Sequence, residues 1–281
     1  MKYVIAKDKE GKDITVRELQ LALLPIMDEI HRVCVKNKIP YAMHAGSALG
    51  IINYKGFIPW DDDIDVIIPW EHWDKFVKCM KKDLKDEFYF QCFETDHKYN
   101  ILIPEMKVRK KGTRIEEVNT LLKNRCKGDG IFIDVSRYGP ASENVLVDQL
   151  NRTVVKICMP FLVLLDNLRI PHPYFKKFIL WFSNKYFERN KNSNVVSQTI
   201  AIPWEKFLKE PIFNREDIFP FRLYEFEGRQ YYSYNNIGNV MKKWHGPNCY
   251  NKDQSKKWKE TLPKEKRVPK HTKYLNLNSE E

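Results

Sequence analysis

Four aspartates stand within five positions where the chain enters an apolar run. The segment from Trp60 to Ile68 reads WDDDIDVII, and its second half is typical of a buried strand. Side chains alternate across a strand, so Asp61, Asp63 and Asp65 share one face. Carboxylates this close repel one another and raise one another's pKa unless a cation lies between them. The run therefore predicts a divalent metal site at the mouth of a buried strand.

Three kinds of cation site compete for this run. An EF-hand calcium loop needs glycine at its sixth position and glutamate at its twelfth, but counting from Asp61 these are Val66 and His72. The DxD of a glycosyltransferase, which holds the metal of a nucleotide sugar, explains Asp63 and Asp65 and nothing else. A nucleotidyltransferase-like site needs two more parts, a Gly-Ser turn at a helix start and an acid on a later strand. The sequence contains both.

The first part is Gly46-Ser47, with Ser47 sixteen residues before Asp63. Glycine lets the backbone approach a phosphate, and a helix start offers free N–H groups to an anion. The second part is Asp134, a lone acid in an apolar strand, where burial without a partner is unfavourable. We predict Asp63, Asp65 and Asp134 as metal ligands and catalytic residues, and Gly46 and Ser47 as donor-binding residues. An ordinary turn and a hydrogen-bonded structural aspartate are the alternatives.

Two basic residues, Lys107 and Arg109, alternate onto one side of a predicted strand. We predict that they contact the phosphates of the donor, with a solvated strand end as the alternative. His44 lies beside the Gly-Ser turn, and a hydrogen-bonded structural histidine is the favoured interpretation.

The order of the elements predicts an α/β (α+β) fold with a nucleotidyltransferase-like mixed sheet flanked by helices. Periodicity predicts helices at 15–37, 47–53 and 71–82 and strands at 41–45, 88–93, 101–109 and 131–135. After Pro140 the pattern changes to long helices at 143–166 and 174–189, and no later strand is as clear. We expect a catalytic core at 1–140 and a largely helical C-terminal part at 141–281, packed together as one unit.

Composition narrows the class of protein. With 281 residues, of which 43% are hydrophobic, the chain can bury a sizeable core. Its net charge of +11 favours an anionic partner, but it has no zinc-finger, recognition-helix or RNA-binding signature, so nucleic acid is not expected. Six cysteines without CxxC spacing indicate reduced packing residues. With no signal peptide or long apolar run, we expect a cytoplasmic protein that is either soluble or peripheral, at the inner face of the membrane in the second case.

Four segments together resemble the LicD/fukutin family of phosphotransferases. They are residues 44–50 (HAGSALG), 54–65 (YKGFIPWDDDID), 107–113 (KVRKKGT) and 132–135 (FIDV). The resemblance implies transfer of a phospho-alcohol, phosphocholine foremost, from a CDP-linked donor such as CDP-choline, with release of CMP. The implied cofactor is Mg²⁺ or Mn²⁺. The implied acceptor is a sugar hydroxyl on a glycan or lipid-linked glycan, as in teichoic acid, lipopolysaccharide or capsule.

Two alternatives to this function remain open. The chain could be a true nucleotidyltransferase that moves NMP from NTP and releases pyrophosphate. It could also be a catalytically inactive glycan-binding module.

Two features of the C-terminal part allow both a functional and a packing interpretation. Late aromatic residues could cage a quaternary ammonium through cation–π contacts or simply fill the core; they are Tyr231, Tyr232, Tyr234, Trp244, Tyr250 and Trp258. Residues 174–182 mix bulky apolar and basic side chains, and could rest on a membrane or pack on the catalytic part.

Overall fold

A seven-stranded sheet forms the centre of the computed structural model, which describes residues 4–8, 10–101, 105–115, 129–198, 212–250, 252 and 275–277. Its strands are β3 (Ala42–His44), β4 (Asp65–Pro69), β5 (Phe88–Cys92), β6 (Met106–Lys110), β8 (Phe132–Pro140), β9 (Val195–Ser197) and β10 (Phe213–Asn214). The long strand β8 pairs with β4 along one edge, and with β6 and then β9 along the other. The β4–β8 pair is parallel and the other pairs are antiparallel, so the predicted mixed sheet is confirmed.

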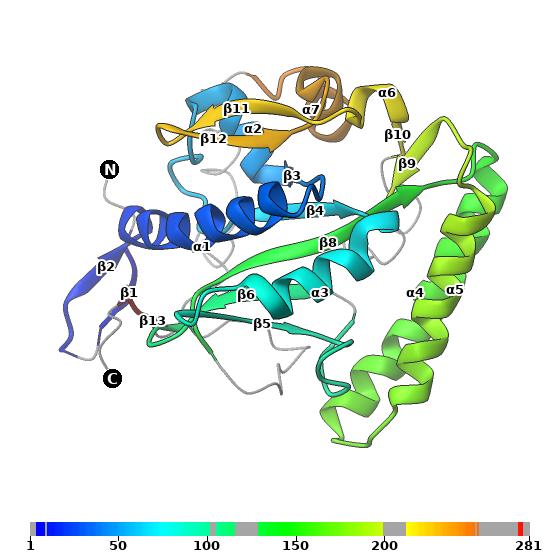
Figure 1. The fold of residues 1–281 in the computed structure, drawn as a ribbon, viewed down its shortest axis with the longest axis horizontal. Helices are drawn as coiled ribbons and strands as arrows, with labels where there is room; N and C mark the ends of the chain where they lie inside the picture. The colour runs from blue at the N-terminus through cyan, green and yellow to red at the C-terminus, as the bar shows by residue number, and fades with distance from the viewer. Residues whose placement is uncertain are drawn as a thin grey trace.

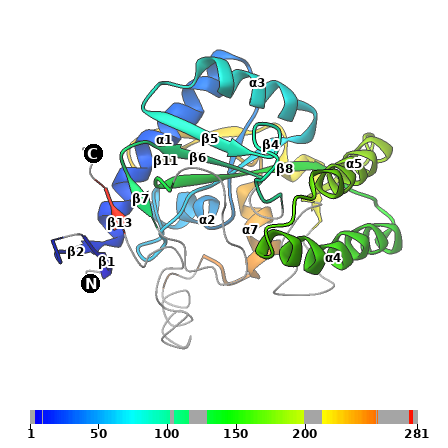
Figure 2. The same ribbon diagram turned by 90° about the horizontal axis from the view of Figure 1, so that it is seen from below.

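Helices cover both faces of this sheet. Figure 2 shows α1 (Val16–Lys36) and α3 (Trp73–Asp83) on one side, and α2 (Ala45–Tyr54) and α7 (Ile237–His245) on the other. A capping box starts α1: the Thr15 N–H donates to Glu18 Oε2 at 2.7 Å, and the Glu18 N–H donates to Thr15 Oγ1 at 3.3 Å. The apolar stripe of α1 is buried at Leu19, Leu23, Leu24, Ile26, Met27, Ile30 and Val33. The predicted helix at 15–37 is therefore present and packs on the sheet.

The acidic run ends in a strand that is buried on both faces. Val66, Ile67 and Ile68 of β4 are all at most 1% exposed. A strand with a parallel neighbour and helices on both sides reads as a continuous apolar run, because neither face meets water. This burial explains why the sequence changes abruptly from aspartates to aliphatic residues.

The C-terminal part contains the predicted long helices. Helices α4 (Val145–Asn167) and α5 (Pro173–Arg189) form a hairpin at one end of the sheet, drawn in green in Figure 1. The part also contains the short helix α6 (Arg215–Ile218) and a β-hairpin of β11 (Arg222–Phe226) and β12 (Arg229–Ser233). Strands β9 and β10 extend the central sheet beyond residue 140, so the boundary expected there remains a prediction.

The remaining elements are short. They are β1 (Val4–Lys7) paired with β2 (Asp13–Thr15), β7 (Arg114–Ile115) paired with β13 (Leu275–Asn276), and the 3₁₀ turn η1 (Trp70–His72). Within the described ranges, none of the helices combines the length and the apolar character that crossing a membrane requires.

We expect Gly50→Ala to destabilise the fold. Alanine is favoured over glycine inside a helix by about 1 kcal/mol. At this position in α2, however, a Cβ would lie 2.4 Å from the backbone oxygen of Gly56, which cannot move without shifting the chain. Such overpacking typically costs about 1–3 kcal/mol and should outweigh the helix propensity. A lower urea midpoint of unfolding would show it.

Gly238→Ala in α7 is the matched control. There the nearest atom to a new Cβ is the Tyr250 hydroxyl oxygen at 3.1 Å, at the end of a side chain that can give way. Its urea midpoint should stay unchanged or rise, and equal losses in the two variants would contradict the steric argument.

Candidate active site

One row of residues crosses five strands of the sheet. In register, His44 lies opposite Asp65, Asp65 opposite Asp134, Asp134 opposite Lys107, and Lys107 opposite Gln91. Residues directly opposite each other in a sheet project from the same face. The fold therefore places Asp65 and Asp134, which are far apart in the sequence, on adjacent strands and on one face.

A hydrogen bond to Ser47 connects the start of α2 with the acidic strand. The backbone N–H of Asp65 donates to Ser47 Oγ at 3.1 Å, and the Ser47 side chain is buried. The predicted Gly-Ser turn thus lies at the N-terminus of a helix and beside Asp65, as the sequence pattern required. The structure brings Ser47, Asp65 and Asp134 together; their roles in binding and catalysis remain predictions.

Lys107 contacts Asp134 directly. Its Nζ donates to Asp134 Oδ1 at 3.1 Å and lies 3.3 Å from the centroid of the Phe132 ring. Both side chains of the ion pair are largely buried, at 6% exposure for Lys107 and 17% for Asp134. The ammonium group therefore supplies the partner that a lone acid in an apolar strand needs.

Arg109 lies on the same side of β6 but deeper in the protein. Its Nε donates to Gln91 Oε1 at 2.7 Å and its Nη1 donates to the Gly130 carbonyl at 2.5 Å. The guanidinium carbon is 4.7 Å from the Phe132 ring centroid, and the residue is 2% exposed. In this conformation Arg109 links β5 and β6 to Gly130. Because the side chain is buried, its predicted contact with the donor would require a change of conformation that exposes it.

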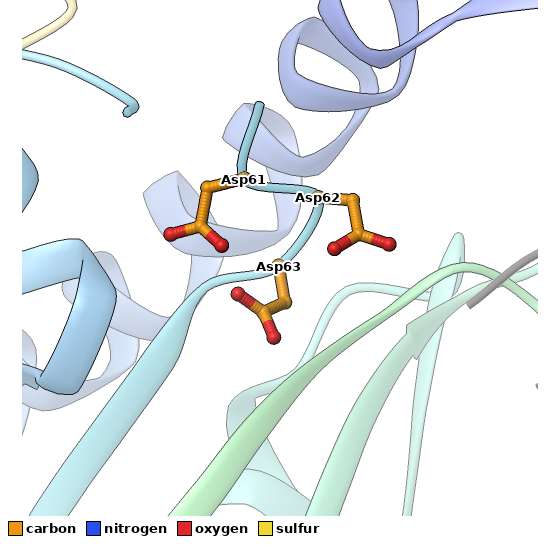
Figure 3. Close-up of side chains that lie close together, drawn as sticks. All are labelled: Asp61, Asp62 and Asp63. Carbon is orange, nitrogen blue, oxygen red and sulfur yellow. The ribbon is translucent and has the colours of Figure 1, made fainter. Parts of the chain in front are cut away.

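Three consecutive carboxylates form the tightest acidic cluster in the described part of the chain. Asp61, Asp62 and Asp63 lie in the loop that leads into β4, and each offers an oxygen within 4.8 Å of the others (Figure 3). Burial and the negative charges of Asp63, Asp62 and Asp65 raise the pKa of Asp61 well above its ordinary value. A cation would relieve the repulsion that a proton otherwise relieves, so the cluster fits a divalent metal.

This cluster overlaps only in part with the ligands that we predicted. Asp63 belongs to both groups, whereas Asp61 and Asp62 were not predicted as ligands. Strand alternation placed Asp61 with Asp63, but it did not indicate that the chain is still a loop at these positions and lets Asp62 turn back toward its neighbours. The regular strand begins only at Asp65.

Gly46 leaves room for the acidic loop. A Cβ at this position would lie 2.6 Å from Asp61 Oδ2. The Asp61 carboxylate therefore rests against the first turn of α2, where the helix dipole favours a negative charge. Gly46 thus makes space for a carboxylate of the site, a role that differs from the predicted contact with the donor and can coexist with it.

Two residues that sequence reasoning missed hold this loop in place. The buried Gln20 of α1 donates from Nε2 to the backbone oxygens of Ile58, at 3.1 Å, and Asp61, at 2.8 Å. Glu227, in the turn between β11 and β12, accepts from the Phe57 N–H at 3.1 Å. Its carboxylate also accepts two hydrogen bonds from Arg17, at 2.9 and 2.7 Å. No local pattern signals such contacts, because each joins distant segments.

Aromatic residues surround His44 at the end of the row. Its ring lies 4.7 Å from that of Trp244 and 5.6 Å from that of Tyr138, and its Nδ1 is hydrogen-bonded to the Tyr234 hydroxyl. Burial lowers the pKa of His44 to about 3, so the ring is neutral. This is the structural histidine that we favoured.

The aromatic residues that could form an ammonium cage are divided between different places. Tyr234 and Trp244 lie at His44, whereas Tyr231 and Tyr232 pack around His31. Tyr250 donates to the Gly238 carbonyl of α7, and Trp258 is outside the described residues. Of the predicted set, only Tyr234 and Trp244 are therefore shown beside the acidic row.

Comparison with known proteins agrees with this geometry. Residues 38–139 match the family model described as LicD/FKTN/FKRP, nucleotidyltransferase domain. The chain is 39% identical over 83 residues to the lipopolysaccharide cholinephosphotransferase LicD of Haemophilus influenzae. The aligned segment covers 30% of this chain and 31% of that protein. An uncharacterised protein of Rickettsia typhi is 35% identical over 66 residues, covering 23% of this chain and 21% of that protein.

The matched segment contains the start of α2, the acidic loop, and the two adjacent strands that carry Asp65 and Asp134. This segment is therefore similar to the nucleotidyltransferase domain of the LicD family, as the resemblance in its motifs indicated. The matches span less than a third of the relatives' own length.

We expect Asp61→Asn to weaken the binding of Mn²⁺ or Mg²⁺ by roughly tenfold or more, because it removes one of three converging carboxylates. Calorimetric titration of the metal would measure the change. Asp134→Asn distinguishes the loop cluster from the ligand set that we predicted, which includes Asp134. A metal affinity close to that of the wild type would assign the metal to the loop cluster. A loss as large as that of Asp61→Asn would assign it to the loop and Asp134 together. Asp74→Asn, an exposed acid on α3, is the control.

We expect Gln20→Met to loosen the acidic loop. Methionine keeps most of the volume but removes both hydrogen bonds to the loop backbone, so the metal affinity should fall while helix α1 persists. The free energy of unfolding should drop by about 1–3 kcal/mol. Calorimetry with Mn²⁺ together with urea unfolding checks both effects. Unchanged metal affinity in a destabilised variant would show that the loop does not depend on Gln20.

Acid should destabilise the fold partly through His44. Its pKa is about 3 in the folded protein and ordinarily 6.5, so below pH 6.5 the unfolded chain binds a proton that the folded chain does not. Stability therefore falls as the pH falls through this window. The difference in unfolding free energy between the wild type and His44→Asn should shrink from about pH 7 to about pH 5. A constant difference would contradict the argument.

Proposed function

We propose that the protein is a metal-dependent phosphotransferase that moves phosphocholine from CDP-choline to a sugar hydroxyl of a cell-surface glycan precursor and releases CMP. The single observation that carries the proposal is the convergence of Asp65 and Asp134, on adjacent strands, beside the acidic loop and the start of α2. The match to the nucleotidyltransferase domain of the family and to a lipopolysaccharide cholinephosphotransferase supports the type of reaction.

The residues of the chain divide into three roles in this proposal. Asp61, Asp62 and Asp63, with Asp65 next to them, would hold Mg²⁺ or Mn²⁺. When bound, the cation supplies positive charge that offsets the diphosphate of the donor. Asp134 accepts the proton of the attacking hydroxyl, and its contact with Lys107 orients it for this task.

The bonds that change can be stated from the donor. The acceptor oxygen attacks the phosphorus that carries choline, and its proton goes to Asp134. The bond from this phosphorus to the bridging oxygen breaks, and that oxygen leaves with CMP. The N–H groups in the first turn of α2, beside Ser47, would donate to phosphate oxygens of the donor.

Trp244 is our candidate for contact with the choline group. It is half-buried, packs on the ring of His44, and so lies one strand away from Asp65. An aromatic face attracts a quaternary ammonium by cation–π interaction. Trp244→Leu should therefore raise KM for CDP-choline more than for CDP-ribitol, which has no cation, and Trp244→Phe should retain part of the preference.

The proposal is tested by incubating the protein with Mg²⁺ and a panel of CDP-alcohols, and by following CMP with and without candidate glycan acceptors. We expect Asp134→Asn to lower kcat by about 10²–10⁴-fold with KM little changed. Asp63→Asn and Asp65→Asn should abolish turnover, and Asp74→Asn should not. Circular dichroism confirms that each variant is folded.

Two outcomes would replace the proposal. Pyrophosphate release from an NTP, in place of CMP release from a CDP-alcohol, would show a true nucleotidyltransferase. Glycan binding without turnover of any donor, and without binding of Mg²⁺ or Mn²⁺, would show an inactive binding module.

A further inference from the structure

The α4–α5 hairpin exposes an unusual amount of apolar surface. Among the described residues, twelve of the sixteen large apolar side chains that are strongly exposed lie between positions 145 and 181. They are Val145, Leu146, Val147, Leu150, Ile157, Phe161, Leu164, Leu168, Ile170, Tyr174, Phe178 and Trp181. Monomeric proteins rarely expose apolar side chains in such a concentration, so this surface calls for a partner.

Five of these side chains form one stripe along α4. Leu146, Leu150, Ile157, Phe161 and Leu164 are spaced by three, four or seven residues, which places them on one side of the helix. They are between 53% and 74% exposed. The stripe therefore faces away from the protein.

The opposite side of α4 packs against the rest of the protein. Met159 and Leu162 are buried with Ile179 of α5 and with Phe93 and Ile101 from the region that follows β5. In Figure 1 the hairpin stands at one end of the sheet, with a single layer of helices there. The exposed stripe is thus not needed to attach the hairpin to the protein.

Most of the exposed charged residues of the hairpin are basic, whereas most of its acidic residues are buried. Between residues 144 and 187 the exposed charged residues are Arg169, Lys177 and Lys185, all basic. The acids of this stretch, Asp148 and Asp166, are buried. Asp148 pairs with Arg152 at 2.7 Å and Asp166 with Lys176 at 3.0 Å. At the end of α5 an exposed acid, Glu188, forms an ion pair with Lys185.

We propose that the exposed face of the α4–α5 hairpin docks on the surface of an anionic lipid bilayer. Aliphatic residues of α4 would enter the boundary of the acyl chains, as in helices that lie in the membrane plane. Tyr174 and Trp181 of α5 suit the level of the headgroups, and Arg169 and Lys177 suit anionic lipid.

A second copy of the chain is the competing occupant. A symmetric dimer through this face would bring Arg169 and Lys177 of two hairpins together, and the exposed acid of α5, Glu188, already pairs with Lys185. Charge complementarity therefore favours the bilayer.

The bilayer as partner deepens the proposed function, because a lipid-linked acceptor would be presented at the same surface. The inference rests on the proposed function only through this acceptor. Binding to vesicles needs neither donor nor acceptor. Its failure would leave CMP release from CDP-choline untouched, and failure of the transferase assay would leave vesicle binding untouched.

The test is co-sedimentation of the full chain with vesicles of phosphatidylcholine alone or mixed with phosphatidylglycerol. The first variant carries Ile157→Gln, Phe161→Gln and Leu164→Gln, which change exposed side chains only. Leu21→Gln with Leu223→Gln is the matched control, since these residues are 47% and 50% exposed and lie outside the hairpin. Arg169→Gln with Lys177→Gln tests the charges.

We expect the wild type and the control to bind the mixed vesicles equally, and the α4 variant to lose roughly tenfold or more of its partition coefficient. The charge variant should lose the preference for phosphatidylglycerol and keep weak binding to both vesicles. Equal binding of the α4 variant and the wild type would overturn the proposal. So would a wild type that ignores vesicles but sediments as a dimer that the α4 variant dissociates, which would assign the face to a second copy.

Discussion

The parallel pairing of β4 with β8 brings together two of the predicted catalytic residues. It sets Asp65 beside Asp134, and the antiparallel neighbours add His44 on one side and Lys107 on the other. A buried ion pair such as Lys107–Asp134 contributes little net stability, because desolvation of the two charges offsets their attraction. Apolar residues would fill this place in a sheet at least as well. The pair is therefore better explained by the proposed reaction than by the stability of the fold.

The acidic loop poses a different physical problem, because its carboxylates repel one another and would separate if the backbone were free. The backbone is held from two directions, by Gln20 of α1 and by Glu227 of the β11–β12 turn. Glu227 is itself fixed by Arg17, also of α1, and lies so close to Gly56 that a Cβ there would be 2.4 Å from its Oε1. The first helix and the last hairpin thus meet at the loop, so residues on both sides of position 140 build one site.

Local patterns predicted several elements well and the contacts between elements poorly. The helix predicted at 15–37 and the strand at 88–93 are observed as Val16–Lys36 and Phe88–Cys92, because periodicity records which face is buried. Alternation correctly put Lys107 and Arg109 on one side of their strand, but their burial depends on β8 and Phe132, which lie elsewhere in the chain. The β11–β12 hairpin was missed although Glu227-Gly228 marks its turn with positive φ angles of 53° and 70°, since its strands mix polar and aromatic residues without a clear apolar face.

The distribution of charge explains why cation and donor should bind as a pair. A diphosphate that approaches the start of α2 meets Asp61, Asp62 and Asp63 within a few ångströms of one another, although the chain as a whole carries a net charge of +11. The net positive charge would attract the proposed donor at long range, whereas the loop would repel it at short range unless a cation were present. Each ligand must then raise the affinity of the other by the same factor, because coupling between two binding equilibria is reciprocal. A site that held the donor equally well without metal would have no use for three adjacent carboxylates.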